Sequence, residues 1–501
     1  MELVFRASEM KEIDQNTSDK FGLDAAILME RAALQMADII EERFPKDFSV
    51  GILCGPGNNG ADGVCLARIL FLRKHSVRFY VSARLDSRSD LMQKQIEIAG
   101  KYGLLPEKAV LNLSSSRILV DALFGIGQNR PLEGQYLLDY QALSDFAGIR
   151  IACDIPTGVD ADTGQLLGFC IPQDMTITFA YRKMGQLLYP GRSICGELLV
   201  ADVGIYEDES IQRKVRCSLL EESDLPGLLP KRRADSNKGT YGKVLDIAGS
   251  GTISGAAVLS AKAALRVGAG YVRLYSDERN RNILATSFPE AIIHGYRAEE
   301  VDYSVLTNLM QDADAILIGP GIGTDKTAYS ILKHVCKYAK DRPLVIDADG
   351  LNILSDHEEL LENLPVNTVL TPHMGELSRL MKLSIPEIKA HAVEYALHFS
   401  KRYKTVLVMK DATSLICGQS GNVLVNTYGN SGMATAGSGD VLAGIISGLM
   451  AQGQDPMNAA SLGVLLHALS GDMAARKKSE YAILASDILD GMTDVLLNIE
   501  K

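Results

Sequence analysis

The chain has 501 residues, of which 47% are hydrophobic and 23% are charged, and its formal net charge is −11. This length predicts two or three domains, and the composition is typical of a soluble globular protein. The acidic balance argues against broad binding to the backbone of a nucleic acid. Apolar runs end well before the length of a membrane span, and the amino terminus has no apparent secretory or transit signal.

The eight cysteines are scattered and form no Cys-x-x-Cys pair. Such a distribution favours reduced thiols, so we expect neither a disulfide nor structural zinc. We also expect a cytoplasmic protein with neither nucleic acid nor a membrane as a partner.

Short β-branched runs alternate with longer amphipathic stretches along the whole chain, a pattern that predicts parallel sheets covered by helices. Both halves are therefore expected to be α/β. The periodicity weakens between residues 206 and 236 and ends in a polar stretch at 230–239, which predicts a linker with a boundary near residue 215. The expected strands are 50–54, 77–81, 118–121, 149–154, 175–179 and 198–203 in the first half, and 244–248, 271–275, 315–319, 344–347, 368–371 and 405–410 in the second.

A glycine-rich loop at 55–63 follows the first predicted strand and precedes an apolar helix. Its Gly-x-Gly-x-x-Gly spacing suits a pyrophosphate at a helix start, although this spacing is weak evidence by itself. Asn58 and Asn59 add carboxamide groups that a dinucleotide loop does not require. The two asparagines therefore indicate a ligand more specific than the pyrophosphate of a general dinucleotide loop.

Three further polar residues, Asp121, Asp154 and Thr157, lie at or just beyond the ends of two other predicted strands. The carboxyl ends of parallel strands converge on one crevice, so these residues can meet Asn59 there. Their oxygens suit a hard cation, and one carboxylate can exchange a proton with a substrate. The alternative is that each aspartate only stabilises its own turn.

The Asn-Asn-Gly-x-Asp-Gly loop, Asp-Ala-Leu-Phe-Gly-Ile-Gly and Asp-Ile-Pro-Thr-Gly-Val-Asp together resemble the NAD(P)H-hydrate epimerase family over residues 1–215. The resemblance implies a Rossmann-like, doubly wound domain, with K⁺ bound by Asn59, Asp121 and Thr157 and with Asp154 as a catalytic candidate. Ala61 departs from the glycine common in the family, and we expect its methyl group to narrow the phosphate loop. The implied contacts to the hydrated nucleotide are Asn58, Asn59, Gly60, Ala61, Asp62, Gly125, Ile126, Gly127, Gln128, Asn129, Arg130, Pro131 and Asp154.

The strongest signal in the chain is the run at 429–444, where closely spaced glycines precede Asp440 and an apolar helix. Backbone N–H groups and the positive end of a helix dipole suit a phosphate at this position. An acid beside that phosphate can take a proton from a hydroxyl as phosphoryl transfer begins. Asp440 is therefore our candidate base, the alternative being a simple helix cap. The run resembles the Gly-x-Gly-Asp signature of ribokinase-like folds.

Four other segments of the second half also follow predicted strands, and each allows a structural alternative. The loop 319–324 is a ligand loop or a tight turn, and the acids of 347–352 order water bound to Mg²⁺ or cap a helix. His373 in 371–377 is a catalyst or, more often for a lone histidine, a structural residue. Lys410 in 410–414 meets a nucleotide phosphate or belongs to a solvated turn.

Taken in order, these motifs resemble the ADP- or ATP-dependent NAD(P)H-hydrate dehydratases over residues 225–501, and the whole chain resembles the bifunctional NAD(P)H-hydrate repair enzymes. The resemblance implies a ribokinase-like α/β domain, NADHX and NADPHX as substrates, ADP or ATP with Mg²⁺, and a homo-oligomer. Asp411 and Ala412 depart from a glycine common after the lysine, which puts the geometry of the nucleotide loop in question. The implied substrate contacts are Ala256, Gly321, His373 and Asp440, and the implied nucleotide contacts are Lys410, Asp411, Ala412, Thr413, Ser414 and Gly439.

Two other functions are open at this stage. The second domain can instead be a kinase for a hydroxymethyl compound, in which case its product is a stable phosphate ester. The first domain can be a ligand sensor or scaffold, against which Asn59, Asp121 and Asp154 argue.

Overall fold

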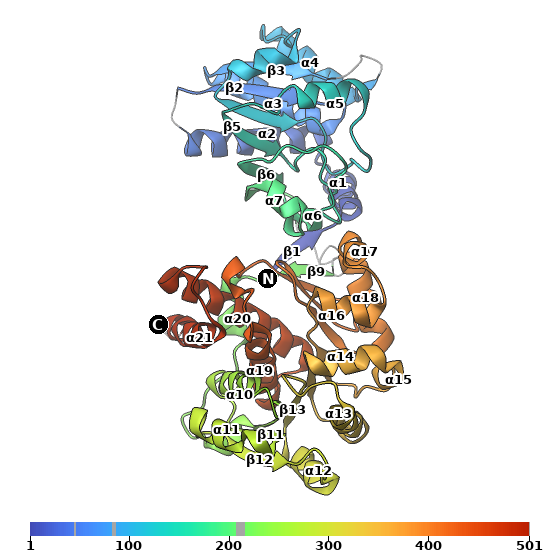
Figure 1. Cartoon of the computed structure of the whole chain (residues 1–501). Coiled ribbons are helices and arrows are strands. Elements are labelled where there is room, and N and C mark those ends of the chain that lie inside the picture. The colour runs from blue at the N-terminus through green and yellow to red at the C-terminus, as the bar shows by residue number, and fades with distance from the viewer. Residues whose placement is uncertain (45–46, 83–86, 207–215, 500–501) are drawn as a thin grey trace. The chain divides into compact units, whose positions relative to one another are not determined.

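The computed structural model describes residues 1–44, 47–82, 87–206 and 216–499 (Figure 1). The chain divides into two compact units, Leu3–Val215 and Met1–Glu2 with Arg216–Lys501. The boundary predicted near residue 215 falls on a residue outside the described ranges. Both units are built from parallel strands and covering helices, which confirms the predicted α/β class.

The N-terminal unit contains a six-stranded sheet in the order β3-β2-β4-β5-β6-β8, and every neighbouring pair is parallel. Its strands confirm the six predicted ones, with small shifts at the ends. Outside the six-stranded sheet, β1 (Glu2–Phe5) pairs in parallel with β7 (Arg182–Lys183). The sheet strands are β2 (Ser49–Cys54), β3 (Ser76–Val81), β4 (Ile118–Ala122), β5 (Ile149–Cys153), β6 (Met175–Phe179) and β8 (Glu197–Ala201).

Helix α3 (Asn58–Leu72) follows β2 directly and packs closely on the sheet. A Cβ atom at Gly63 would lie 2.7 Å from the Cβ of Ala122, so glycine lets the helix approach β4. The residues from Val64 to Leu70 are buried. The other helices of the unit are α1 (Ala7–Phe21), α2 (Ala25–Arg43), α4 (Asp90–Lys101), α5 (Gly134–Gln141), α6 (Met184–Leu187) and α7 (Gly191–Cys195).

In the C-terminal unit the strands follow the order β12-β11-β10-β13-β14-β15-β16-β17-β18-β9. They are parallel from β12 to β16, after which β17 and β18 run antiparallel as a hairpin. The six predicted strands are present. They are β10 (Lys243–Ile247), β11 (Tyr271–Asp277), β13 (Ala315–Ile318), β14 (Leu344–Ile346), β15 (Thr368–Leu370) and β16 (Val406–Met409).

Four strands of this unit were not expected from the sequence: β9 (Cys217–Leu219), β12 (Ile292–Tyr296), β17 (Ser414–Cys417) and β18 (Val423–Asn426). β9 lies inside the stretch 206–236 where the periodicity weakens, before the polar segment 230–239 that was predicted to be a linker. Its three residues are too few to show a period, and the strand exists because it pairs with β18. The sequence pattern therefore predicts too few strands where the strands are short.

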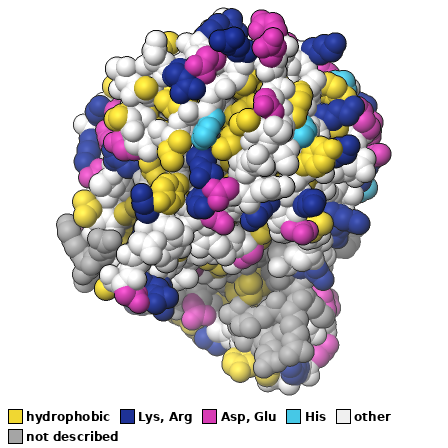
Figure 2. All heavy atoms as spheres, turned by 90° about the horizontal axis from the view of Figure 1, so that it is seen from below, with side chains coloured by type: hydrophobic (Ala, Val, Ile, Leu, Met, Phe, Trp, Pro, Cys, Tyr) yellow, Lys and Arg dark blue, Asp and Glu magenta, His cyan; other side chains and the backbone are white. Residues whose placement is uncertain are grey.

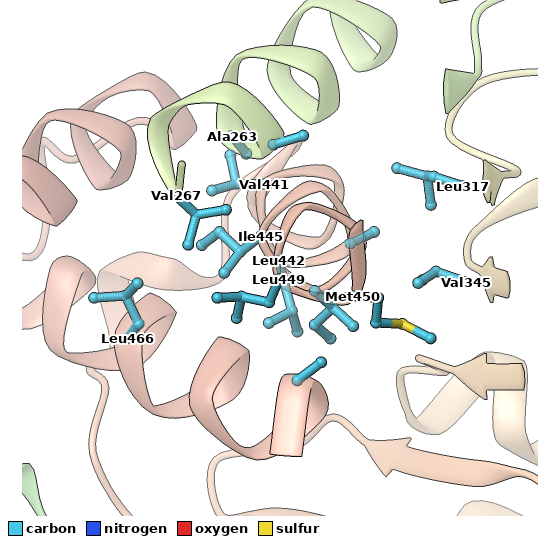
Figure 3. Packing of buried hydrophobic residues seen from close by; sticks show 14 of the residues in the cluster. Ala263, Val267, Leu317, Val345, Val441, Leu442, Ile445, Leu449, Met450 and Leu466 are labelled. Atoms are coloured by element: carbon cyan, nitrogen blue, oxygen red, sulfur yellow. The ribbon is translucent and has the colours of Figure 1, made fainter. Parts of the chain in front are cut away.

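Helix α19 (Ser438–Ala451) lies at the centre of the C-terminal core, and its residues from Val441 to Ala451 are all buried. It packs between α10 (Gly255–Arg266), α20 (Pro456–Lys478) and the strands β13 and β14, as Figure 3 shows. The remaining helices are α9 (Leu225–Leu228), α11 (Arg281–Ser287), α12 (Tyr303–Asp312), α13 (Lys326–Tyr338), α14 (Asp349–Asp356), α15 (Glu358–Leu361), α16 (Met374–Met381), α17 (Ile385–Ala390), α18 (Ala392–Tyr403) and α21 (Ala485–Ile499).

Acidic and basic side chains are interspersed on the face that Figure 2 shows. Among the described helices, none combines the length and the apolar character needed to cross a membrane. All eight cysteines are free, and Cys170 alone is only partly buried.

The close contact between α10 and α19 gives a stability prediction. A Cβ at Gly444 would lie 2.2 Å from the carbonyl oxygen of Ser260 and 2.8 Å from the Cβ of Ala263. We expect Gly444→Ala to lower the free energy of unfolding of this unit by about 1–3 kcal/mol through overpacking. Denaturant unfolding measures the change.

The matched control is Gly227→Ala, because a Cβ at Gly227 meets nothing within 4 Å. It should change stability by less than about 1 kcal/mol. Equal effects of the two substitutions would contradict the packing argument.

Candidate active sites

The loop before α3 brings its backbone against the end of β4. A Cβ at Gly55 would lie 1.7 Å from the carbonyl oxygen of Leu123, and one at Gly60 would lie 2.0 Å from that of Gly55. Only glycine permits these approaches. The first turn of α3 is thereby placed beside the segment that begins at Gly125, with its free N–H groups available to an anion.

The predicted ligand residues of this loop have different surroundings. Asn58 is exposed at the start of α3, whereas the amide nitrogen of Asn59 is buried and has no partner among the described residues. The methyl group of Ala61 packs in the hydrophobic core, so the expectation that it narrows the phosphate loop is wrong. Desolvation raises the pKa of Asp62 well above its usual value, and the charges of Asp154 and Asp14 add to this rise.

Asp121 and Thr157 are in direct contact. The Thr157 hydroxyl donates to Asp121 Oδ1 at 2.7 Å, and the Thr157 backbone N–H donates to Oδ2 at 3.0 Å. The Tyr140 hydroxyl and the Leu123 N–H also donate to this carboxylate, at 2.9 and 3.2 Å. Burial raises the pKa of Asp121, and the hydrogen bonds from Thr157 oppose the rise. All four donors are neutral, so no protein cation balances this charge within the network.

Asn59 reaches the same region through Gly125, since a Cβ there would lie 3.1 Å from the Asn59 side chain. The Thr157 hydroxyl lies 3.4 Å from the carbonyl oxygen of Phe124. Asn59, Asp121 and Thr157, three of the four residues predicted to bind a cation or act as an acid, therefore lie close together. Asp154 belongs to a different hydrogen-bond group, described below.

The segment 125–131 lies partly at the surface. Gln128 accepts a hydrogen bond from the Gly158 N–H at 2.8 Å and donates to the Arg130 carbonyl at 3.1 Å. Ile126 packs against two small hydrophobic clusters, while Pro131 lies next to Gly168. The exposed members are Gly127, Asn129, Arg130 and Pro131.

Asp154 follows β5 and has a positive φ of 67°, which is uncommon for an aspartate. Its Oδ1 accepts hydrogen bonds from Lys183 Nζ at 2.5 Å, Thr178 Oγ1 at 3.0 Å and the Phe179 N–H at 3.3 Å. Its Oδ2 has no hydrogen-bond partner among the residues that the structure describes. One oxygen of this carboxylate is thus fully occupied and the other is free.

In the C-terminal unit, Asp440 stands in the first turn of α19. Burial raises the pKa of Asp440 to about 7, the charge of Asp347 adds to the rise, and Lys410 opposes it. Gly437 has a φ of 89°, and a Cβ at Gly439 would lie 3.1 Å from Lys410 Nζ. A carboxylate that titrates near neutral pH at a glycine-lined helix start is suited to general base chemistry.

An ion pair with the buried Asp347 holds the partly buried Lys410 in place next to this helix start. Lys410 Nζ donates to Asp347 Oδ1 at 2.9 Å, and the Thr371 hydroxyl donates to the same oxygen at 2.7 Å. Burial disfavours the charge of Lys410, but the carboxylates of Asp347 and Glu376 raise its pKa. Lys410 is therefore cationic at neutral pH and faces the position where Gly439 has no side chain.

His373 caps α16, and its Nδ1 accepts from the N–H groups of Gly375 and Glu376 at 3.0 and 3.4 Å. Burial, Lys410 and Arg379 lower the pKa of His373. The neutral ring therefore carries its proton on Nε2, and the side chain is 56% exposed. Burial raises the pKa of Glu376 to about 7. His373 thus has a structural role and still presents a donor to a ligand.

The remaining predicted substrate contacts lie around Ile253. A Cβ at Gly321 would lie 2.7 Å from Ile253 Cγ2 and 3.1 Å from the Cβ of Ala256, so these residues share one surface. Asp349, in the first turn of α14, accepts from the Gly323 N–H at 2.9 Å. This carboxylate anchors the 319–323 loop as well as standing at a helix start.

The loop 410–414 is ordered by its own side chains. Asp411 pairs with Lys389 at 2.6 Å and accepts from the Ala412 N–H at 2.9 Å. Ser414 donates to the Asp411 carbonyl at 3.2 Å and begins β17, and Thr413 is buried. Neither Asp411 nor Ala412 is among the described residues with a positive φ. The loop therefore does not need the glycine that is common after the lysine.

The sequence reasoning did not select Lys183, Asp14, Tyr140 or Asp246 as site residues. Lys183 ends the two-residue strand β7, which is too short for the sequence pattern to reveal, so no signal pointed to it. Asp246 is buried in β10, where Ser260 donates to it at 2.6 Å, and burial raises its pKa to about 8. The sequence feature that could have identified Asp246 is that it is a single acidic residue within an apolar strand.

Comparisons with known proteins find relatives of both units. Residues 244–493 match a family described as NAD(P)H-hydrate dehydratase, and residues 25–185 match the YjeF-related protein N-terminus. A relative from Thermofilum pendens, a bifunctional NAD(P)H-hydrate repair enzyme, is 36% identical over 99% of this chain and 94% of its own length. The chain belongs to the family of bifunctional NAD(P)H-hydrate repair enzymes.

Other members of the repair-enzyme family are similar over the same extent. The Moorella thermoacetica enzyme is 35% identical over 99% of this chain and 97% of its own length. Two solved structures match the C-terminal unit, each covering 56% of this chain with a TM-score of 0.50. They are a ribokinase-like protein of Enterococcus faecalis, 32% identical over 96% of its chain, and the Bacillus subtilis ADP/ATP-dependent NAD(P)H-hydrate dehydratase co-crystallized with ATP/Mg²⁺, 28% identical over 97% of its chain. The predicted ribokinase-like fold is confirmed.

The Asp121 network yields a second stability prediction. Thr157 is fully buried, and its hydroxyl also accepts from the Phe124 N–H at 3.0 Å. Thr157→Val removes the hydrogen bond to Asp121 and the one from Phe124, and we expect it to lower the free energy of unfolding by about 1–3 kcal/mol. Thr157→Ser keeps the hydroxyl and should cost less than about 1 kcal/mol. Denaturant unfolding of the N-terminal unit compares them, and equal losses would contradict a hydrogen-bonding role.

Proposed function

We propose that this chain repairs hydrated NADH and NADPH with two linked activities. The N-terminal unit epimerises the R and S hydrates, and the C-terminal unit dehydrates the S form to NAD(P)H with ADP or ATP. Full-length similarity to the repair enzymes supports this proposal. The observation that carries the chemistry is Asp440, whose pKa is about 7, at a helix start that Lys410 faces.

Dehydration must remove a hydroxyl group that leaves poorly as hydroxide. Asp440 takes the hydroxyl proton while the oxygen attacks the terminal phosphorus of the nucleotide, and the bond from that phosphorus to its bridging oxygen breaks, so the leaving group becomes phosphate. The lone pair of the ring nitrogen then expels this phosphate and leaves an iminium. Loss of a proton from the neighbouring ring carbon to the departing phosphate restores the conjugated ring. Lys410 and the N–H groups at Gly439 balance negative charge on the transferred phosphoryl group.

The residues of the site fit a magnesium ion held with the nucleotide. Four carboxyl groups lie close enough here to interact electrostatically, those of Asp347, Asp349, Glu376 and Asp440. Lys410 is the cation that opposes the rise in pKa of Asp440 and Glu376. When bound, Mg²⁺ offsets phosphate charge, and Asp347 and Asp349 are the carboxylates that would hold it, in part through water. In the proposed site, Ala256, Gly321 and His373 position the hydrated ring, and residues 410–414 position the nucleotide.

The raised pKa of Asp440 predicts the pH dependence of dehydration. The base is active when ionised, so kcat/KM should fall about tenfold for each pH unit below about 7 and stay level above it. Asp440→Asn should lower dehydratase kcat by at least about 10²-fold and leave epimerisation unchanged. Recovery of NADH absorbance measures the first activity, and chromatography of the two epimers measures the second.

A variant that keeps more than about a tenth of the activity would contradict the assignment of Asp440 as base. Accumulation of a stable phosphate ester by the wild type would instead indicate a kinase.

Epimerisation inverts the carbon that carries the hydroxyl. In the ring-opening route, Asp154 accepts the hydroxyl proton, and the bond from this carbon to the ring nitrogen breaks with its electron pair moving to nitrogen. The proton returns to that nitrogen, the open chain rotates, and the reverse steps close the ring on the other face. The N–H groups at 58–62 and the segment 125–131 hold the nucleotide in this proposal. In an iminium route Asp154 would instead donate a proton to the departing hydroxyl and take one back from the water that adds to the other face.

The Asp121 network fits a potassium ion. It offers a buried carboxylate with only neutral donors, the Thr157 hydroxyl, the Phe124 carbonyl and the side-chain oxygen of Asn59, which lies 3.2 Å from the position of a Cβ at Gly125. Oxygen-rich sites of this kind suit hard cations. When bound, the ion would supply positive charge to this end of the sheet. The cytoplasmic location and the homo-oligomer stay predictions.

Asp154→Asn tests the epimerase proposal. We expect it to lower the rate of epimer exchange by at least about 10²-fold, because the amide cannot accept the hydroxyl proton. Dehydration of the S hydrate by the same chain serves as the control and should stay within about twofold. Unchanged epimer exchange in the variant would reject Asp154 as the acid–base group.

A further inference from the structure

Lys183 is a buried cation that the proposed epimerisation does not itself use. Its side chain is 1% exposed, and it stands at the junction of β7 and α6. Nζ donates to Asp154 Oδ1 at 2.5 Å, Thr178 Oγ1 at 2.8 Å and the Phe179 carbonyl at 3.0 Å. Three acceptors match the three protons of an ammonium group, so Lys183 has none left to give to a substrate.

The same short helix also fixes the backbone of Asp154. Gln186 Nε2 donates to the Asp154 carbonyl at 2.6 Å, and Gln186 Oε1 accepts from the Lys183 N–H at 2.8 Å. The Asp154 N–H donates to the Ile177 carbonyl at 2.8 Å. These bonds hold the residue at its positive φ of 67°, a strained conformation that persists only where the surroundings impose it.

The charges around this pair explain why a cation is needed. Asp14 approaches from α1 and Asp62 from α3, and both interact with Asp154, as does the buried thiol of Cys153 on β5. Desolvation raises the pKa of Asp14 to about 6, Lys183 opposes the rise, and Asp154 adds to it. The carboxyl groups of Asp14 and Asp62 therefore lie close to the Asp154–Lys183 pair, and Lys183 is the cation that pairs with Asp154.

We propose that Lys183 is the positioning residue of the epimerase site: it occupies Asp154 Oδ1 and supplies the counter-charge of this carboxylate, so that Oδ2 is left to accept the substrate proton. This inference rests on the proposed epimerase role of Asp154. Lys183 itself transfers no proton. Its contribution is the charge and the orientation of the neighbouring base.

The test uses the full-length chain and a mixture of both NADHX epimers, whose interconversion is followed by chromatography. We expect Lys183→Met to lower the kcat of epimerisation by about 10²-fold, with KM changed by less than about threefold. We also expect the acidic limb of the pH–rate profile to move up by at least about one pH unit, because the base has lost its counter-charge. A structural contribution alone would not move that limb.

Two further variants separate charge from hydrogen bonding. Thr178→Val removes a neutral donor to the same oxygen, at 3.0 Å, and should cost less than about tenfold without moving the pH profile. Lys183→Arg keeps the charge and should hold the acidic limb in place, within about tenfold of the wild-type kcat. Lys183→Gln is a second neutral variant, and thermal unfolding with dehydratase activity of the same chain verifies that each variant is folded.

The inference is overturned if Lys183→Met and Lys183→Gln keep kcat within about threefold of wild type and the same pH profile while Asp154→Asn is inactive. If Asp154→Asn still exchanges the epimers, the proposed role of Asp154 fails and the inference fails with it. If the wild-type chain does not exchange them, the epimerase proposal itself is wrong.

Discussion

Parallel strand pairing is the constraint on which both sites depend. In the N-terminal sheet, and from β12 to β16 in the C-terminal unit, neighbouring strands run in the same direction, so their carboxyl ends fall at one edge of the sheet. Asp121 at the end of β4 and Thr157 beyond β5 meet for this reason, as do Asp347 beyond β14 and Thr371 beyond β15. Apolar packing behind each sheet pays the entropic cost of holding these polar groups in place.

Both sites also contain more carboxylates than cations. In the C-terminal unit the excess contributes to the raised pKa of Asp440 and of Glu376, each to about 7. In the N-terminal unit it contributes to the raised pKa of Asp14 and Asp62. A buried excess of negative charge destabilises the folded state unless a ligand, a cation or a proton compensates it. The same excess of negative charge gives both clusters carboxyl groups with a pKa of about 6 to 7, namely Asp14, Glu376 and Asp440.

Much of this arrangement follows from local sequence patterns. The strands before the 55–63 loop and before Asp121 were predictable because each is a short apolar run, and helix α19 because it follows a glycine-rich turn. Lys183 was not predictable in this way, since β7 has two residues and α6 has four, too few for any periodicity. Ala61 was misjudged because a sequence does not tell which side of a helix start faces the core.

The sequence by itself determined the α/β class, the long strands and the family, because apolar periodicity and glycine spacing are local properties of the chain. Only the tertiary structure decided that β9 joins β18, that Asp154 pairs with Lys183 and not with Asp121, and that Asp440 lies among other carboxylates. The physical reason is that pairing partners, burial and electrostatic interactions depend on distances between residues far apart in the chain. Those distances exist only after the strands have paired and the helices have packed.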